Sequence, residues 1–302
     1  MSPRTRARTP SPERSAPPGR PAPSARHVLV TGAAGGIGAA ICAAFAEEGC
    51  TVTASDLPGA PLNALVERLA AQGVSARALP ADLSGAQAAA DLVGRASDLA
   101  GTPGVLVNAA GIYPATPLGE MTAEVWDRVM DVNVRAAMLT TTALARTLIE
   151  RGETGTVVNI TSGAALRARP GAAHYSASKA ALEMLTRSCA VEFGAHGIRV
   201  NAVSPGFVTV DSAANPVTDA YAAAVSVNPL GRPGEPDDIA RAVRWVAGPE
   251  ASWMTGSIVR LDGGASAGTT TLPLHWPQLS GTQAGAAPDT AASGAAPHQE
   301  AS

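Results

Sequence analysis

Tyr175 and Lys179 stand four residues apart in the stretch HYSASK, residues 174–179. If this stretch is helical, the two side chains share one face, one turn apart. Lys179 is the only lysine in the chain, and every other member of its 22 Lys and Arg residues is an arginine. A neighbouring ammonium stabilises a phenolate, so Tyr175 would become a better proton donor and acceptor near neutral pH. Arginine carries the charge but cannot exchange a proton, which explains why a lysine stands here.

Further polar residues surround this pair, and each has an alternative role. Ser162 follows the apolar run 157–161, so its hydroxyl can hold a carbonyl or alcohol oxygen beside Tyr175, or it can simply form a turn before Gly163. Asn133, taken alone, would be a buried residue that satisfies a helix carbonyl. His174 diverges from Tyr175 on a helix, so we expect it to pack or to form a pocket wall. Lys179 itself could be an ordinary surface lysine, and the pair alone does not decide.

The elements that would position these residues follow a regular alternation between residues 27 and 268. Expected strands cover 27–31, 51–55, 74–79, 104–108, 155–161, 198–203 and 256–261. Expected helices cover about 36–48, 61–72, 84–100, 122–150, 172–195 and 235–247. Apolar strands that alternate with helices predict a parallel sheet with both faces covered. The expected fold is one doubly wound α/β domain of about seven parallel strands.

A glycine-rich turn, residues 32–38, connects the first expected strand to the first expected helix. Gly32, Gly36 and Gly38 allow a tight turn and a close backbone approach, and the helix start offers N–H groups to a pyrophosphate. Asp56 ends the second strand, where a carboxylate can bind an adenosine ribose and repel a 2′-phosphate. No Lys or Arg occurs in the turn, which favours NAD over NADP. The alternative is that Asp56 only begins the Pro58-Gly59 turn.

Other polar residues also follow strands, at the edge where open α/β sheets bind ligands. Asp82, beside Leu83, can bind the adenine amino group or cap the next helix. Asn108 can pin neighbouring strands, and the small residues Ala109 and Gly111 allow a cofactor to lie close to the backbone.

Together and in this order, these motifs resemble the classical short-chain dehydrogenases/reductases, including 3-oxoacyl-carrier-protein reductases and NAD-dependent alcohol dehydrogenases. The resemblance covers nearly all of 27–268 and rests on Thr31-Gly32-x-x-x-Gly36-x-Gly38, Asp82, Asn108-Ala109-Ala110-Gly111, Asn133, Ser162, Tyr175-x-x-x-Lys179, Pro205-Gly206, 228–236, Thr255-Gly256 and 261–264. It implies a Rossmann-type domain with a catalytic set of Asn133, Ser162, Tyr175 and Lys179. It also implies that Asn133 kinks its helix and holds a proton-relay water, and that the nicotinamide carboxamide meets backbone groups after Pro205.

The expected cofactor-binding residues are Gly32, Gly35, Gly36, Ile37, Gly38, Asp56, Asp82, Leu83, Asn108, Ala109, Gly111, Tyr175, Lys179, Pro205, Gly206 and Val208. The expected substrate pocket comprises Ser162, Ala164, Leu166, His174 and Phe207, with Ile112, Tyr113 and Tyr221 as further walls. This mainly apolar lining favours a hydrophobic alcohol or ketone. One departure from the family is Val210, where a threonine is usual, so whether Thr209 makes the nicotinamide contact stays open. Arg167 and Arg169 either meet an acidic or carrier-bound substrate or are solvated.

Composition limits the remaining possibilities. A net charge of −3 and a pI near 6.0 predict no nucleic-acid partner, and no apolar run is long enough for a membrane span. The three cysteines have neither metal-ligand nor paired spacing, so we expect free thiols, no metal site and a cytoplasmic protein. Residues 1–26, rich in proline and arginine, read as a disordered basic arm, and 269–302 as a flexible tail. Residues 211–230 would form a substrate lid.

Three functions compete. The first is hydride transfer between NAD(H) and a secondary alcohol or ketone, with Tyr175 as general acid/base. The second is NADPH-dependent reduction of 3-oxoacyl groups on an acyl carrier, which Asp56 opposes. The third is a catalytically silent dinucleotide-binding sensor or scaffold, which the intact Ser162, Tyr175 and Lys179 disfavour. Apolar residues on more than one face of 122–150 and 172–195 predict packing across a subunit interface. The resemblance implies a homotetramer, with a homodimer as the alternative.

Overall fold

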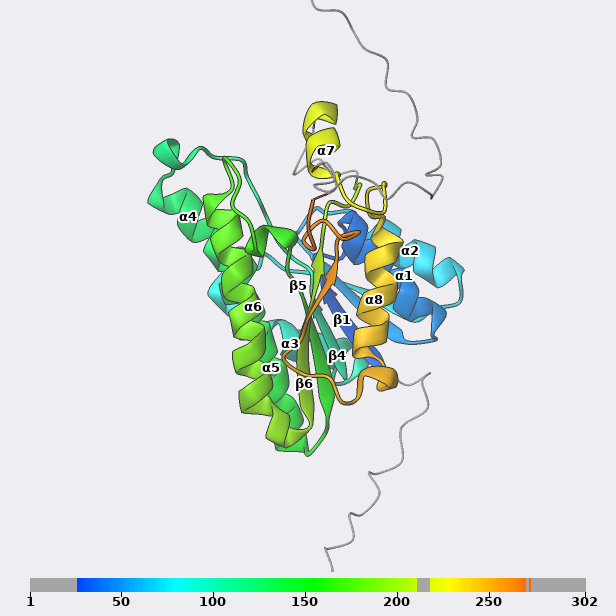
Figure 1. Ribbon diagram of the computed structural model, residues 1–302. Coiled ribbons are helices and arrows are strands. Elements are labelled where there is room, and N and C mark those ends of the chain that lie inside the picture. The colour runs from blue at the N-terminus through cyan, green and yellow to red at the C-terminus, as the bar shows by residue number, and fades with distance from the viewer. Residues whose placement is uncertain (1–25, 211–217, 270–271, 273–302) are drawn as a thin grey trace, which may run out of the picture. The chain divides into compact units, whose positions relative to one another are not determined.

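The computed structural model describes residues 26–210, 218–269 and 272. Its centre is a parallel sheet of seven strands in the order β3-β2-β1-β4-β5-β6-β7, which confirms the predicted fold (Figure 1). The strands are β1 (His27–Thr31), β2 (Thr51–Asp56), β3 (Ala76–Pro80), β4 (Val105–Asn108), β5 (Gly155–Ile160), β6 (Ile198–Pro205) and β7 (Ile258–Leu261). The order reverses at β1, which pairs with β2 on one side and β4 on the other. Such a reversal opens a crevice at the carboxyl ends of the strands.

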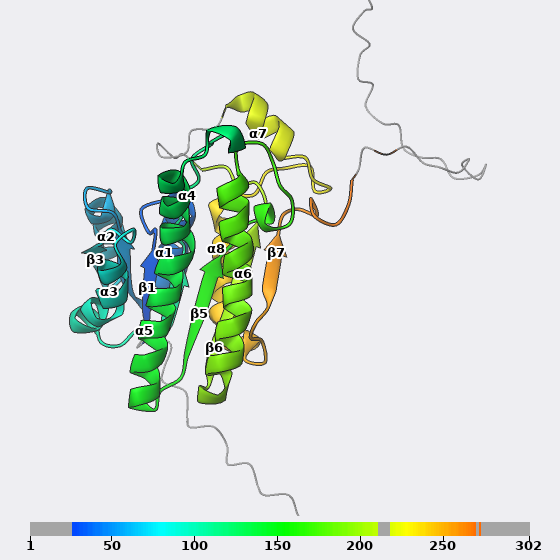
Figure 2. The same cartoon turned by 90° about the vertical axis from the view of Figure 1, so that its left-hand side faces the viewer.

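Alternate residues of the strands face two separate cores. Val28 and Val30 of β1 pack with α1 (Gly36–Glu47), α2 (Leu62–Ala71) and α8 (Pro236–Ala247). Leu29, between them, packs with α3 (Ala86–Ala100), α5 (Ala136–Arg151) and α6 (Ala173–Phe193). Because both faces of the sheet are covered, the strands are continuously apolar. Figures 1 and 2 show α5 and α6 in green on one face and α1 and α8 on the other.

The segment expected as one helix, 122–150, is divided into three parts. α4 (Ala123–Met130) leads into a π-helical segment at Asp131–Arg135, and α5 follows. A π-helical turn inserts one extra residue per turn, and it often occurs at functional sites. Asn133 lies within this segment, so the irregularity falls at the position where the family resemblance implied a kink.

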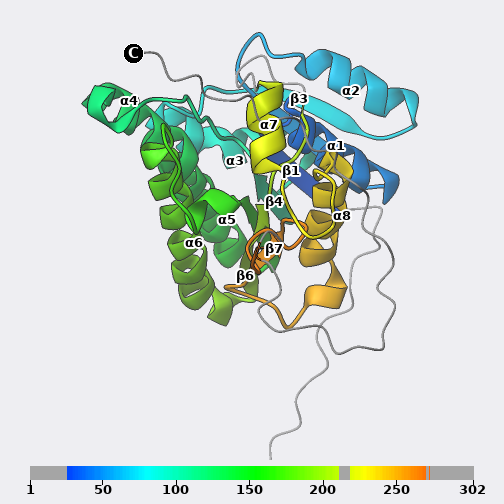
Figure 3. The same cartoon turned by 45° about the horizontal axis from the view of Figure 1, so that its top comes forward.

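Several features differ from those expected. β3 begins at Ala76 rather than Val74, because the Val74 N–H bonds back to the Leu69 carbonyl at the end of α2. Arg26 belongs to the folded domain, since its guanidinium donates to the Ala247 carbonyl. The expected lid contains a short helix, α7 (Asp219–Val225), which lies beyond the carboxyl edge of the sheet (Figure 3). The other predicted parts of the arm, the lid (211–217) and the tail lie outside the described residues, apart from Thr269 and Leu272.

The described residues contain no helix long and apolar enough to cross a membrane. They also contain no cluster of three or more His, Cys, Asp or Glu side chains that could hold a metal ion. Cys42, Cys50 and Cys189 are buried, and none of them forms a disulfide. Burial raises the pKa of Cys42 to about 12, so this thiol stays protonated at neutral pH.

Candidate active site

Lys179 lies at the centre of the candidate site, on the face of α6 that packs against the sheet. It is 4% exposed, and its Nζ donates a hydrogen bond to the Ile160 carbonyl at 2.9 Å. Nζ also lies 5.7 Å from the centre of the Tyr175 ring, as expected for residues one helical turn apart. Burial lowers the pKa of Lys179 to about 8. No described carboxylate pairs with this ammonium, so its remaining N–H donors are available to a ligand.

Ser162 and Tyr175 come together although they lie on different elements. Ser162 is the N-cap of the 3₁₀ turn Gly163–Ala165, directly after β5, and its hydroxyl accepts from the Ala164 N–H. Burial raises the pKa of Tyr175, whereas a hydrogen bond with Ser162 and the charge of Arg169 act in the opposite direction. The structure therefore brings a second cation, Arg169, close to the phenol in addition to Lys179.

Asn133 joins the loop after β4 to α6. Its Oδ1 accepts from the Ile112 N–H, and its Nδ2 donates to the Ile112 carbonyl, both at 2.9 Å. Nδ2 also donates to the Ser178 hydroxyl, which in turn donates to the Tyr175 carbonyl. Asn133 thus satisfies the backbone of a distant loop rather than a carbonyl of its own helix. It connects this loop to the turn of α6 that carries Tyr175.

Gly111 brings the backbone close to both functional groups. A Cβ atom there would lie 3.3 Å from the Lys179 Nζ and 3.4 Å from the Asn133 Oδ1. A side chain at this position would therefore crowd the ammonium and the carboxamide. The sequence predicts a small residue at position 111 so that a cofactor can lie close to the backbone. The closeness of Lys179 and Asn133 is a second reason for a glycine there.

The glycine turn has the geometry of a phosphate-binding loop. Gly32 has φ +65°, and a Cβ there would lie 2.7 Å from backbone atoms of Ala109 and Ala110. No side chain caps α1 at Gly35, which leaves the N–H groups of its first turn to a ligand. The residues present therefore fit a dinucleotide with its pyrophosphate at Gly36, Ile37 and Gly38. Val210 lies against Gly36, where a Cβ would come within 2.9 Å of its side chain.

Asp56 ends β2 beside this turn and is fixed by two backbone groups. Its Oδ2 accepts from the Ala34 N–H at 2.9 Å, and its Oδ1 accepts from the Leu57 N–H at 2.7 Å. A carboxylate held beside the glycine turn fits an adenosine ribose and repels a 2′-phosphate. The alternative of a simple turn residue does not explain the bond to Ala34, which is distant in sequence.

Asp82 and Asn108 take structural bonds in addition to any ligand role. The Asp82 carboxylate accepts from the Ser84 N–H, and its bonds to Ser84 are the main reason that its pKa is lowered. Its neighbour Leu83 is buried. Asn108 donates to Asn159 on β5 and accepts from the Thr140 hydroxyl on α5, so it pins two strands and a helix. This network continues from Asn159 to Thr186 on α6, which sequence reasoning missed.

The segment after β6 presents backbone groups. The Gly206 N–H donates to the Leu261 carbonyl. Val208 and Gly234 form a parallel bridge, in which the Thr209 N–H donates to the Gly234 carbonyl and the Gly234 N–H donates to the Phe207 carbonyl. The N–H and carbonyl of Val208 itself have no partner among the described residues. They therefore fit the carboxamide of a nicotinamide, whereas the Thr209 N–H is taken by Gly234.

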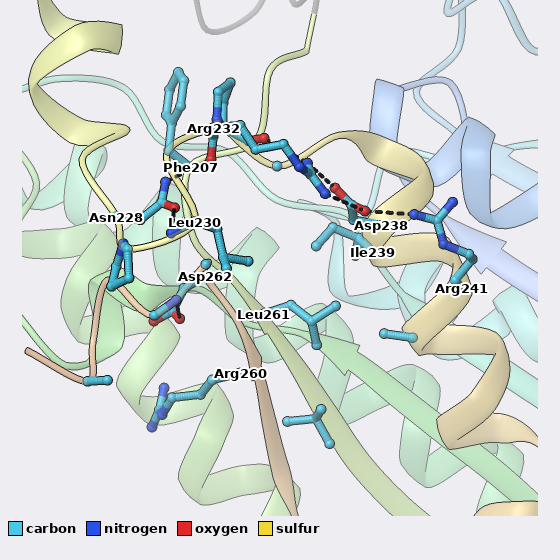
Figure 4. Close-up of a pocket in the computed structure, with 18 of the residues that line it drawn as sticks. Phe207, Asn228, Leu230, Arg232, Asp238, Ile239, Arg241, Arg260, Leu261 and Asp262 are labelled. Atoms are coloured by element: carbon cyan, nitrogen blue, oxygen red, sulfur yellow. Dashed lines mark hydrogen bonds and ion pairs between the residues drawn. The ribbon is translucent and has the colours of Figure 1, made fainter. Parts of the chain in front are cut away.

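The expected pocket residues lie in different surroundings. Ala164 is half-buried, Leu166 is 48% exposed, and His174 is completely buried. Burial lowers the pKa of His174, which fits a packing role. Phe207 lines a pocket of about 890 Å³ between β7, α8 and the loop 228–234 (Figure 4). That pocket does not include Ser162, Tyr175 or Lys179.

The sequence allows Arg169 either a substrate contact or a solvated position, and the structure brings it beside Tyr175. Its guanidinium carbon lies 5.9 Å from the centre of the Tyr175 ring, 5.2 Å from that of Tyr113 and 5.6 Å from that of Tyr221. These are the chain's only three tyrosines. The signal available in the sequence was an arginine between Ser162 and Tyr175, but spacing alone could not separate Arg169 from Arg167.

Known proteins resemble the chain over this whole domain. The family described as enoyl-(acyl carrier protein) reductase matches residues 32–266. An uncharacterized oxidoreductase of Methylorubrum extorquens is 40% identical over 78% of this chain and 96% of its own length. A 3-oxoacyl-[acyl-carrier-protein] reductase of Thermotoga maritima is 35% identical over the same shares of the two chains. A blue fluorescent protein from a metagenomic library, solved in complex with NADPH, is 36% identical, with a TM-score of 0.73 over 79% of this chain and 97% of that one. The chain therefore belongs to the short-chain dehydrogenase/reductase family of oxidoreductases.

Proposed function

We propose that the chain transfers hydride between NAD(H) and a secondary alcohol or ketone, with Tyr175 as the general acid/base. One observation carries the proposal: the buried ammonium of Lys179 lies beside Tyr175 and has no described carboxylate partner. The pair stands at the carboxyl edge of the sheet, as do the glycine turn and Ser162. Ligands bind at this edge in open α/β sheets.

Each residue has a defined task in the direction of reduction. When bound, NADH supplies the hydride to the carbonyl carbon. Ser162 holds the carbonyl oxygen by a hydrogen bond, and Tyr175 donates its proton to that oxygen as negative charge develops there. Lys179 stabilises the resulting phenolate and holds the cofactor ribose with its free N–H donors. In oxidation, the phenolate accepts the alcohol proton instead.

Asp56 supports NAD(H) as the cofactor. It lies beside the glycine turn, where it would accept hydrogen bonds from the adenosine ribose and repel a 2′-phosphate. The turn itself contains no lysine or arginine that could bind such a phosphate. Asp82 and Leu83 would hold the adenine, and Val208 the nicotinamide carboxamide.

A second candidate is the NADPH-dependent reduction of 3-oxoacyl groups on an acyl carrier. It is favoured by the name of the Thermotoga maritima relative and by the NADPH complex of the metagenomic protein. Asp56 opposes the cofactor of this candidate but not its substrate.

The same family membership supports an assembly of copies in the cytoplasm. Exposed apolar side chains occur on α5 (Met138, Ile149) and on α6 (Met184, Val191). We propose that these faces pack against other copies in a homotetramer or homodimer. The absence of a disulfide among Cys42, Cys50 and Cys189 fits a reducing compartment. Light scattering of the purified protein measures the mass of the assembly.

The experiment that tests the function is a panel of ketones reduced with NADH and, separately, with NADPH, followed by the absorbance of the reduced nicotinamide. The proposal predicts turnover of at least one ketone with NADH, and a higher kcat/KM with NADH than with NADPH. Preference for NADPH with a 3-oxoacyl thioester would instead support the second candidate. Binding of NADH without turnover of any ketone or alcohol would favour a silent dinucleotide-binding protein.

A further inference from the structure

Arg169 lies among aromatic rings contributed by three separate parts of the chain. Tyr113 comes from the loop after β4, Tyr175 from α6, and Tyr221 from α7 above the carboxyl edge of the sheet. Tyr113 and Tyr175 also contact each other, with ring centres 4.9 Å apart. A guanidinium within about 6 Å of a ring centre is attracted by the ring. Arg169 is therefore held in position next to the proposed acid/base.

The rings leave the hydrogen-bonding groups of Arg169 unused. Within the described ranges, its half-buried side chain makes no hydrogen bond and no ion pair. Other arginines differ: Arg232 and Arg241 both pair with Asp238, and Arg167 donates to the Ala265 carbonyl at 2.8 Å. Aromatic faces offset part of the charge, but they accept none of the five N–H donors in the guanidinium plane.

A group of this kind selects an anion. The planar guanidinium matches a carboxylate, which it binds through two parallel N–H···O bonds. A charge-assisted bond of this type at a partly desolvated site is stronger than one in water. The position beside the Tyr175 ring then fixes where the carboxylate stands relative to the oxygen that Tyr175 protonates. The two groups of the ligand must lie only a few bonds apart.

We propose that Arg169 binds the carboxylate of the substrate, and that the substrate is a short-chain oxo acid or the corresponding hydroxy acid. The inference rests on the proposed function, because it assumes that Tyr175 protonates the ketone oxygen. A 3-oxo acid meets the requirement, since its carboxylate and ketone are separated by a single methylene carbon. The phosphates of an acyl carrier lie many bonds beyond the thioester, so Arg169 does not select them at this distance from Tyr175. Tyr221 extends the contact to α7, so the bound acid lies near this helix.

The test compares acetoacetate with methyl acetoacetate, which has the same ketone but no charge, and with acetoacetyl-CoA. Each is reduced with NADH by the wild type, Arg169→Gln, Arg169→Lys and Arg167→Gln. Arg167→Gln is the matched control, because Arg167 lies in the same loop but is exposed and bonded to Ala265.

We expect the wild type to prefer acetoacetate. Arg169→Gln should lower kcat/KM for acetoacetate by about 10- to 100-fold, mainly through KM, because it removes charge-assisted hydrogen bonds. The loss with methyl acetoacetate should be at least about fivefold smaller, because Arg169 acts on this uncharged substrate only through the pKa of Tyr175. Arg169→Lys should keep more of the acetoacetate activity than Arg169→Gln but less than the wild type. Its ammonium carries the charge but cannot form two parallel hydrogen bonds to a carboxylate. Arg167→Gln should behave as the wild type with both substrates.

Three results would overturn the inference. Equal losses for acid and ester in Arg169→Gln would mean that Arg169 only positions the tyrosine rings. A wild type that reduces the ester or the thioester better than the acid, with no effect of Arg169→Gln, would refute the inference and leave the oxidoreductase function intact. A wild type that reduces none of the panel of ketones would refute the proposed function and the inference together.

Discussion

The Nζ of Lys179 and the carbonyl oxygen of Ile160 lie 2.9 Å apart, in a hydrogen bond that ties α6 to the end of β5. The bond holds a charged group in a position that is almost fully buried, and that burial lowers the pKa of Lys179 to about 8. An unfolded lysine titrates near 10.5. The folded protein therefore binds fewer protons than the unfolded chain between these two pH values.

Stability should consequently depend on pH through Lys179. Because the folded pKa is the lower one, charging this amine destabilises the fold below pH 8, and the penalty disappears as pH rises to about 10.5. The free energy of unfolding of the wild type, relative to Lys179→Met, should increase over this window by up to about 3 kcal/mol. Urea unfolding of both proteins without cofactor measures the difference. If the difference in the free energy of unfolding between the wild type and Lys179→Met stayed constant with pH, the lowered pKa of Lys179 would be contradicted.

Asn133→Ala should destabilise the protein. The variant leaves the N–H and carbonyl of Ile112 without their partner and frees the Ser178 hydroxyl from one bond. Loss of such a buried clamp costs about 1–3 kcal/mol in the free energy of unfolding. Gln87→Ala, which removes an exposed pair with Asp91 on α3, should change it by less than about 0.5 kcal/mol. If urea titrations showed the same decrease in the free energy of unfolding for Asn133→Ala and Gln87→Ala, the hydrogen bonds of Asn133 would stabilise the fold no more than an exposed pair does.

Gly32→Ala should be more damaging than its small volume suggests. The φ of +65° disfavours alanine, and the new Cβ would overlap the backbone at Ala109 and Ala110. We expect a loss of more than about 1 kcal/mol of stability, with weaker NADH binding measured by fluorescence titration. Gly119→Ala is the control, since Gly119 has no neighbour within 4 Å of a Cβ. NADH affinity retained in Gly32→Ala would argue against pyrophosphate binding at this turn.

Asp56→Ala should alter cofactor preference. The ratio of kcat/KM with NADH to that with NADPH is expected to fall by about tenfold or more, because hydrogen bonds to a charged group are lost and a 2′-phosphate is no longer repelled. Asp82→Ala is the matched control, since the adenine is common to both cofactors. Asp82→Ala should weaken the binding of both NADH and NADPH and leave the ratio of their kcat/KM values unchanged. A ratio unaffected by Asp56→Ala would remove the basis for choosing NAD.

Much of the fold could be predicted because local pattern and global architecture agree. Apolar strands such as 27–31 and 105–108 alternate with helices, and only a parallel sheet buries both faces of such strands. The glycine turn and the Tyr175–Lys179 spacing are also local, so they were recognisable without a structure.

The remaining features depend on contacts between residues far apart in sequence. Asn159 and Thr186 read as ordinary strand and helix residues, and only the packing of α6 on β5 makes them hydrogen-bond partners. The gathering of the tyrosines around Arg169 likewise requires α7 to lie over the carboxyl edge of the sheet. Sequence spacing carries no information about either relationship.

The most direct test of the account is the turnover number of Tyr175→Phe with NADH and a ketone that the wild type reduces. The account predicts that kcat falls by about 10²- to 10⁴-fold, because the general acid is lost, while NADH still binds. Ser188→Ala, an exposed position on the same helix, should retain wild-type turnover. Full turnover in Tyr175→Phe would contradict the assignment of Tyr175 as the acid/base.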